Sequence, residues 1–95
     1  MSFIIITTTN ARRDIQQAID WENLRKQGLA IYFLDDLDKK LQALSVTPGM
    51  GSIRYENVHI THTSIFSYNI HYTIDDALQQ ITILRVLHSS RKPLW

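Results

Sequence analysis

Apolar residues recur at helical spacing in the second quarter of the chain, and this pattern constrains the fold more than any other feature. Positions i, i+3, i+4, i+7, i+11 and i+14 are Ala30, Phe33, Leu34, Leu37, Leu41 and Leu44. Such spacing places one face of an α-helix against another layer. On the outer face, Asp35 and Lys39, and likewise Asp36 and Lys40, are spaced as ion pairs one turn apart. The pattern predicts an amphipathic helix that ends in the turn at residues 47–51.

A second amphipathic pattern precedes this helix. Thr9 and Asn10 are N-cap residue types, apolar residues at helical spacing follow them, and Gly28 is a typical helix terminator. The short link at Gly28 predicts that the two helices form an antiparallel hairpin. Before them, residues 3–8 are β-branched and apolar on both parities, as in a strand that is covered on two sides.

The second half of the chain has the residue spacing of β-strands. Residues 66–74 alternate between apolar and polar types, and residues 80–88 are apolar on both parities, as in a central strand. Between 53 and 63 the apolar parity changes, so this segment is either one strand with a bulge near Glu56 and Asn57 or two short strands. We expect a single α+β domain over residues 1–95, of order β-α-α-β-β-β. Its helical hairpin packs on one face of a mostly antiparallel four-stranded sheet.

Composition excludes several classes of site. The chain has 95 residues, a net charge of +1 and no cysteine, which rules out disulfides, thiolate zinc sites and thiol nucleophiles. It carries no glycine-rich phosphate loop and no metalloprotease helix motif. The apolar run at residues 3–6 is too short for a membrane span and lacks the flanks of a signal peptide. We therefore expect a soluble cytoplasmic protein that uses no cofactor and no metal.

The distribution of charge singles out the last predicted strand and the residues after it. Acidic residues stop at Asp76, whereas three basic residues follow, so residues 77–95 are net positive. The candidate residues for binding a target or partner are Arg85, His88, Arg91, Lys92, Trp95, Tyr72 and His59. Of these, Tyr72 falls on the apolar parity of its strand, where aromatic rings most often build the core.

The remaining histidines do not indicate a metal site. His59 and His62 lie three residues apart on an extended segment, which sends their side chains to opposite faces of a strand. Joint metal binding would require a bulge. His71 alternates onto the polar parity beside Asn69 and Thr73, so we expect it at the surface.

Several short motifs occur in a fixed order along nearly the whole chain. In the helical region they are Ala11, Asp14-Ile15, Trp21-Glu22, Gly28-Leu29-Ala30 and Phe33-Leu34. Residues 66–72 (FSYNIHY), residues 86–93 (VLHSSRKP) and Trp95 follow them. In this order and spacing they resemble the RelE/ParE superfamily of toxins from bacterial type II toxin–antitoxin systems, and most of all its plasmid-stabilisation ParE branch. The resemblance implies the β-α-α-β-β-β fold expected above.

Two departures from the family pattern bear on activity. Many relatives carry an arginine where this chain has His59, and a basic residue where it has Ile65. Two positive charges are thus absent, and a neutral histidine lacks both the fixed charge and the fork of donors with which arginine holds phosphate. The resemblance therefore implies a ParE-like toxin that inhibits DNA gyrase by binding and has no active site. The implied partner is a cognate antitoxin that wraps the helices and the sheet in a toxin–antitoxin hetero-oligomer.

Two alternatives stay open. A RelE-like toxin cleaves ribosome-bound mRNA, which needs a base, an acid and cations for the phosphate; His88, Arg85 and Arg91 are the candidates for these catalytic roles. Against this, His88 can simply end its strand and hydrogen-bond to the C-terminal segment, with Arg91 and Trp95 holding the tail on the core. The other alternative is a degenerate, non-toxic family member.

Overall fold

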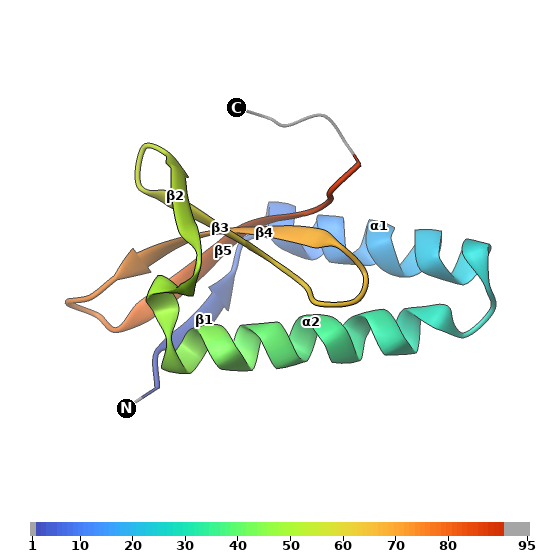
Figure 1. Ribbon diagram of the computed structural model, residues 1–95, viewed down its shortest axis with the longest axis horizontal. Helices are drawn as coiled ribbons and strands as arrows, with labels where there is room; N and C mark the ends of the chain where they lie inside the picture. Colours follow the sequence, from blue (N-terminus) through green and yellow to red (C-terminus); the bar gives the residue numbers. More distant parts are fainter. Residues whose placement is uncertain (1, 91–95) are drawn as a thin grey trace.

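The computed structural model describes residues 2–90 of the chain (Figure 1). The elements in chain order are β1 (Ile4–Thr7), α1 (Thr9–Arg25), α2 (Leu29–Val46), a 3-10 turn η1 (Pro48–Met50), β2 (Ser52–Tyr55), β3 (Val58–His62), β4 (Tyr68–Asp75) and β5 (Gln80–His88). The predicted hairpin of two helices and the strands that follow it are confirmed. In these residues no helix combines the length and apolarity that a membrane crossing requires.

The sheet has five strands in the order β1-β5-β4-β3-β2. β1 runs parallel to β5, and the other neighbours are antiparallel. The predicted four-strand count is corrected to five, because residues 53–63 form two short strands. Tyr55 pairs with Val58 across a two-residue turn in which Glu56 has a φ of 45°. The parity change in the sequence therefore marks a hairpin turn, with a register irregularity between Ile53 and Tyr55.

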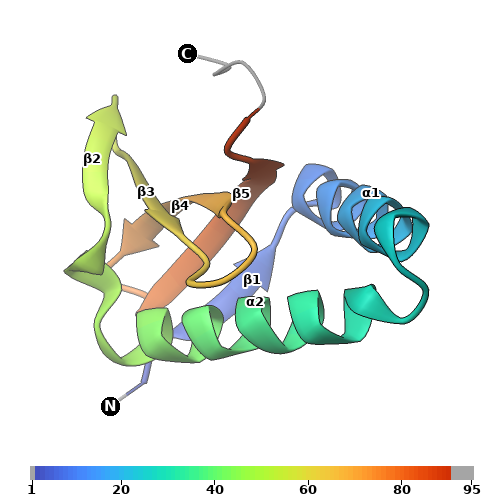
Figure 2. The same cartoon turned by 45° about the vertical axis from the view of Figure 1, so that its right-hand side comes forward.

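The core lies between the helical hairpin and the sheet, and the two helices run side by side along it (Figure 2). Phe33, Leu37 and Leu44 of α2 are buried, as the helical spacing predicts. The strands contribute the even-numbered face of β4 and the matching face of β5, including Ile70, Tyr72 and Ile83. The predicted strand at residues 66–74 is confirmed with one face in the core, but it begins at Tyr68, because residues 66 and 67 belong to the preceding loop.

Local backbone chemistry sets the ends of the helices. The Thr8 side chain accepts a hydrogen bond from the Ala11 N–H at 3.0 Å and caps α1. Gly28 has a φ of 83°, a left-handed conformation that glycine adopts without a steric penalty, and it turns the chain from α1 into α2. The two helices then pack antiparallel, which brings the end of α1 beside the start of α2.

Strand β5 extends beyond its parallel neighbour β1, and helix α1 takes over the edge that is left. β1 pairs only with Gln80–Ile83 of β5. Beyond that point the Thr8 hydroxyl donates to the Leu84 carbonyl at 3.0 Å, and the Asp14 carboxylate accepts from the Val86 N–H at 3.0 Å. Side chains of the helix thus satisfy backbone groups for which no strand partner remains.

Candidate functional site

Three carboxylates on the helices are buried, and each joins the hairpin to the sheet or to the loop before β4. They are Asp14, Glu22 and Asp36. A buried carboxylate is costly unless it is hydrogen-bonded, and all three accept hydrogen bonds from groups distant in the sequence. These three residues therefore determine how the region around the end of β5 is built.

Asp36 fixes the loop between β3 and β4. Its two carboxylate oxygens accept hydrogen bonds from the backbone N–H groups of Ser64, Ile65 and Phe66 at 2.9–3.2 Å. The expected outer-face pair of Asp36 with Lys40 is therefore wrong, because the loop supplies donors that bring this carboxylate inside. The other predicted pair, Asp35 with Lys39, is confirmed at 3.0 Å.

Glu22 is fully buried at the end of α1 and holds two side chains. The Tyr68 hydroxyl donates to one carboxylate oxygen at 2.7 Å, and Nη1 of Arg25 donates to the other at 2.8 Å. The Tyr68 ring meets the His88 ring edge-on, with centroids 5.1 Å apart. Arg25, Glu22, Tyr68 and His88 thus form a contiguous series of contacts from α1 to the end of β5.

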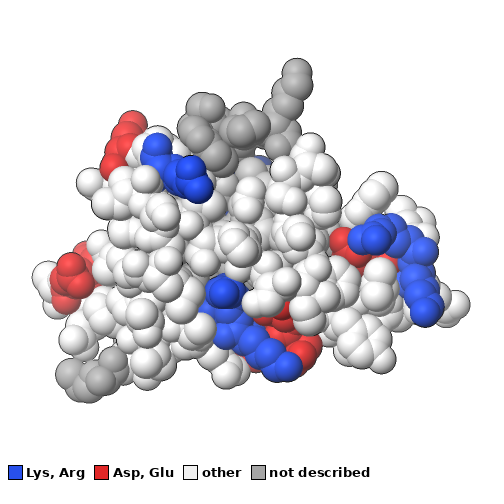
Figure 3. All heavy atoms as spheres, in the orientation of Figure 1, with Lys and Arg blue, Asp and Glu red and all other residues white. Residues whose placement is uncertain are grey.

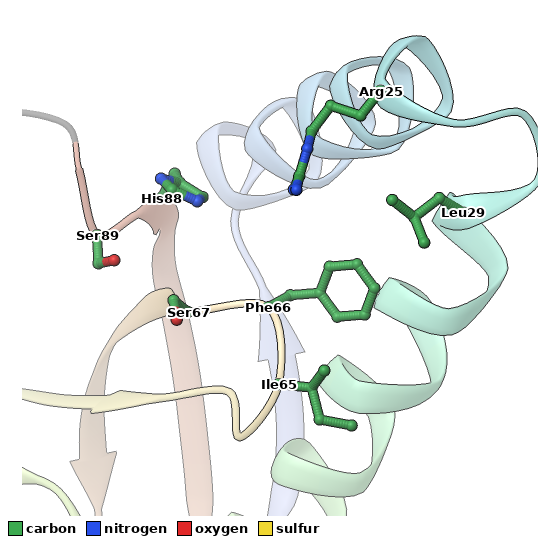
Figure 4. Close-up of a pocket in the computed structure, with 7 residues that line it drawn as sticks. All are labelled: Arg25, Leu29, Ile65, Phe66, Ser67, His88 and Ser89. Atoms are coloured by element: carbon green, nitrogen blue, oxygen red, sulfur yellow. The ribbon is translucent and has the colours of Figure 1, made fainter.

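An open groove of about 460 Å³ lies above this series. Figure 4 shows His88 at the end of β5 on one side of the groove and the Phe66 ring on the other, with Arg25 reaching in from the end of α1. The residues that line the groove are Arg25, Leu29, Ile65, Phe66, Ser67, His88 and Ser89. One side carries the imidazole of His88 and the two serine hydroxyls, and the other carries the apolar side chains of Leu29, Ile65 and Phe66. The guanidinium of Arg25 points from α1 toward the polar side.

The walls of the groove are held by backbone hydrogen bonds. Ser67 adopts a left-handed φ of 58°, an uncommon conformation for a residue with a side chain. Its carbonyl accepts from the Ser89 N–H at 2.9 Å, which ties the loop before β4 to the end of β5. Thr63 closes the same loop, because its backbone N–H donates to the Tyr68 carbonyl and its hydroxyl accepts from the Tyr68 N–H. The groove is therefore preorganised.

Arg85 is committed to a structural ion pair. Its Nε and Nη2 donate to the two oxygens of Asp14 at 2.7 and 3.0 Å, a forked geometry. The hydrogen bond that Arg85 donates to Asp14 raises the pKa of Arg85 above its ordinary value. Since the same carboxylate also accepts from the Val86 N–H, the pair closes the exposed edge of β5.

His71 is buried, and the expectation of a surface position is wrong. It lies opposite Arg85 on β4, and its Nδ1 is 3.2 Å from the Tyr55 hydroxyl of β2. Burial, together with the nearby charge of Arg85, lowers the pKa of His71. Polar side chains on this face of the sheet thus pack against one another. The alternation along the strand predicts a solvent-exposed position because it does not show these neighbours.

Comparison with known proteins identifies the family. The model of the ParE toxin of type II toxin-antitoxin system, parDE, matches residues 5–93. The chain belongs to the ParE toxin family. No curated protein sequence matches it.

Solved structures share the fold of this ParE-family chain. The chromosomal ParDE system from P. aeruginosa aligns with a TM-score of 0.78 at 15% identity, covering 92% of this chain and 96% of that one. The RelBE2 toxin-antitoxin complex from Mycobacterium tuberculosis gives 0.70 at 24% identity, with 93% and 99% covered. The intact RelBE complex of E. coli gives 0.67 at 16% identity, with 95% and 100% covered. The predicted RelE/ParE-like fold is confirmed.

The residues predicted to act in this ParE-family protein occupy three different environments. His88 faces the groove and contacts the Ser90 hydroxyl through Nδ1 at 2.7 Å. Tyr72 is in the core, where its hydroxyl donates to the Pro48 carbonyl at 2.7 Å and accepts from the Gly51 N–H at 2.9 Å. His59 stacks on Tyr72 with ring centroids 5.3 Å apart. Arg91, Lys92 and Trp95 lie outside the described residues.

Sequence reasoning did not select two residues that the ParE-family groove depends on. Arg25 belongs to none of the sequence motifs described above, and Glu22 appears there only as part of a family motif. A fully buried glutamate was not expected, although its i, i+3 spacing to Arg25 is a recognisable signal of an ion pair. Trp21, beside Glu22, remains 52% exposed.

Charge on the face shown in Figure 3 is dispersed. Basic and acidic side chains form mixed groups near its edges, and most of its centre is uncharged. Among residues 2–90, histidine and acidic side chains form no cluster of three that could hold a metal ion. The distinctive chemistry in the described region is therefore the groove with one apolar and one polar wall.

Proposed function

We propose that this ParE-family toxin acts by binding a target protein, DNA gyrase, and not by cutting RNA. The observation that carries the proposal is the forked pair of Arg85 with Asp14. An arginine whose charge is already matched by a forked carboxylate pair has to weaken that pair in order to neutralise the phosphate of a reacting RNA. A surface that recognises a protein has no such requirement.

A cognate antitoxin is the second element of the proposed function. The matched family is defined by a toxin–antitoxin system, and the similar structures from M. tuberculosis and E. coli are complexes of toxin with antitoxin. We propose that a flexible segment of the antitoxin folds on the toxin. Its cost in ordering entropy is offset by contact over the helices and the sheet.

One observation favours RNA cleavage as the competing function. His88 faces an open groove that also presents Arg25 (Figure 4), and a histidine beside a cation is a suitable acid or base near neutral pH. In this competing reading Arg25 would supply the positive charge for which Arg85 is not available.

The two functions are separated by inducing the protein without antitoxin and assaying gyrase supercoiling beside cleavage of ribosome-bound mRNA. We expect supercoiling to be inhibited and the messages to remain intact. The variant His88→Gln is the sharper test, because it removes an acid–base group and keeps a polar side chain. We expect this variant to inhibit gyrase as the parent does, within about twofold, since binding loses no bidentate or charged contact.

Intact gyrase activity together with cut messages that are spared by His88→Gln would reverse the proposal. No growth defect at all from a folded, expressed chain would assign it to the degenerate members of the family.

A further inference from the structure

We infer that the groove between α1 and β5 is a docking site for an acidic and apolar segment of the antitoxin. The segment would place a carboxylate on Arg25 and a bulky apolar side chain beside Ile65. This inference rests on the proposed function for one point, the antitoxin as the source of the segment. The preference of the groove for acidic and apolar peptides can be tested without the antitoxin.

Arg25 is oriented toward the groove by a buried anchor. Within residues 2–90, one of its guanidinium N–H groups donates to fully buried Glu22, and 53% of its side chain is exposed. Figure 4 shows the guanidinium pointing toward His88 across the opening. A guanidinium has five N–H donors, so a second carboxylate can still bind it from the solvent side. Glu22 thus fixes the arginine and does not saturate it.

The charge of the groove suits an incoming carboxylate. Within the described residues, its lining includes a guanidinium, an imidazole and two serine hydroxyls but no acidic side chain. The Ser67 and Ser89 hydroxyls add neutral donors next to His88. An aspartate or glutamate entering here would meet donors on several sides, the arrangement that forms charge-assisted hydrogen bonds.

The opposite wall suits an apolar side chain. Leu29 and Phe66 line it, and Ile65 is 76% exposed at its rim. An isoleucine so exposed on a loop that Asp36 holds by three consecutive N–H groups is a rigid apolar surface. Because the loop is already ordered, a partner loses little free energy in ordering it on binding.

These two walls favour a peptide over nucleic acid. A phosphate backbone carries one charge per nucleotide and is bound through several cations, whereas this groove presents one arginine beside an apolar surface. A volume of about 460 Å³ holds only a few side chains. An amphipathic peptide segment that contains an acidic residue near a leucine, phenylalanine or similar residue fits both walls.

The first test selects ligands for the groove without assuming any partner. A library of random 12-residue peptides displayed on phage is panned on the purified full-length chain, and eluted peptides are re-tested on variants. We expect the selected peptides to combine aspartate or glutamate with a bulky apolar residue. Basic peptides, or an RNA 12-mer that displaces the selected peptides, would overturn the inference in favour of a different ligand.

Substitutions at Ile65 test the site without disturbing the core. We expect Ile65→Asp to weaken binding of the selected peptides at least about tenfold, because it removes apolar contact and adds repulsion. Ile65→Arg should weaken binding less than Ile65→Asp, because it loses the same apolar contact but adds attraction to the acidic residue of the peptide. The matched control is Leu78→Asp, which places the same charge on an exposed apolar residue in the turn between β4 and β5, and it should change the dissociation constant by less than about twofold.

The same variants are then titrated by calorimetry with the protein encoded by the gene next to that of this chain, as the antitoxin probe. We expect the same ranking. Peptide binding that depends on Ile65, with antitoxin binding that does not, would show that the groove serves another partner and would overturn the inference. Absence of any antitoxin binding by the parent chain would instead count against the proposed function, and the peptide arm would still report on the groove.

Discussion

Helix α1 supplies the carboxylates of two arginine–carboxylate pairs, and the pairs differ in how far the arginine remains available to a ligand. Asp14 and Glu22 both lie on the buried face of the helix, two turns apart. Arg85 binds Asp14 through two N–H groups, and 33% of its side chain is exposed. Arg25 binds Glu22 through one N–H group and is 53% exposed. The first pair completes the sheet edge, whereas the second presents a cation to a groove.

The difference shows that the partner of a charged residue decides its role. Arg85 lies on the strand that the charge distribution favours as functional, yet its donors are used inside the fold. Arg25 follows Glu22 on a helix end that carries no functional motif of its own, yet its orientation and exposure make it available. Measurements that remove each pair should therefore separate stability from binding.

The largest effect is expected for Asp14→Asn. The change removes the negative charge that Arg85 and the Val86 N–H share, and it leaves a partly buried cation without its counter-charge. Breaking such a pair from one side costs about 3 kcal/mol of the free energy of unfolding. Urea denaturation followed by circular dichroism measures this loss.

The double variant Asp14→Asn/Arg85→Leu provides the control for this measurement. It removes both charges, so it should be more stable than Asp14→Asn alone. A double variant that loses the sum of the two single losses would show that the two residues do not act as a pair, and the comparison with Arg25 would then fail.

A smaller loss of stability is expected for Arg25→Gln. Glu22 keeps the hydrogen bond from Tyr68, and the exposed half of Arg25 contributes little in water, so the cost is about 1 kcal/mol. Binding should show the opposite order, with peptide affinity lost in Arg25→Gln and kept in Arg85→Gln. Equal loss of peptide binding in both variants would show that Arg25 and Arg85 do not differ in their roles.

The helices and strands could be predicted because their signals are local. Helical spacing in residues 30–44 and alternation in residues 66–74 depend on neighbours a few positions apart. The number of strands was predicted as four and is five, because a change of apolar parity fits a bulge and a turn equally well. The left-handed backbone conformation of Glu56 decides for the turn, and it cannot be recognised in the sequence.

The site depended on contacts that no local pattern contains. Asp14 and Arg85 are 71 positions apart, and Glu22 and Tyr68 are 46 apart. Asp36 lies in a run of charged residues typical of a solvated face, and only the folded loop shows that three N–H groups meet it. His88 is a candidate because it lies among the basic residues at the end of the last strand, and the structure places it at the groove.

The smallest expected effect is a change in stability at mildly acidic pH, and it arises from His71, the neighbour of Arg85. Burial beside Arg85 lowers the pKa of His71, so in mild acid the unfolded chain takes up a proton at this residue that the folded chain does not. Where the unfolded state binds more protons, stability falls as pH falls. The loss begins near the unfolded histidine pKa of about 6.5 and grows as the pH falls toward the lower folded pKa. Above about pH 7.5 this contribution is constant, because His71 is neutral in both states.

The variant His71→Gln isolates this contribution, because it keeps a polar group opposite Arg85 and cannot titrate. Urea denaturation at a series of pH values from about 7.5 to 5.5 should show a smaller loss of stability on acidification in His71→Gln than in the parent. That window lies above the ordinary pKa range of aspartate and glutamate, so Asp14, Glu22 and Asp36 are not the groups being read. If the parent and the variant lose stability in parallel, His71 accepts its proton in the folded state. The surroundings of Arg85 would then tolerate a second positive charge. In that case Arg85 would not differ from Arg25 in its capacity to accept a further charged group.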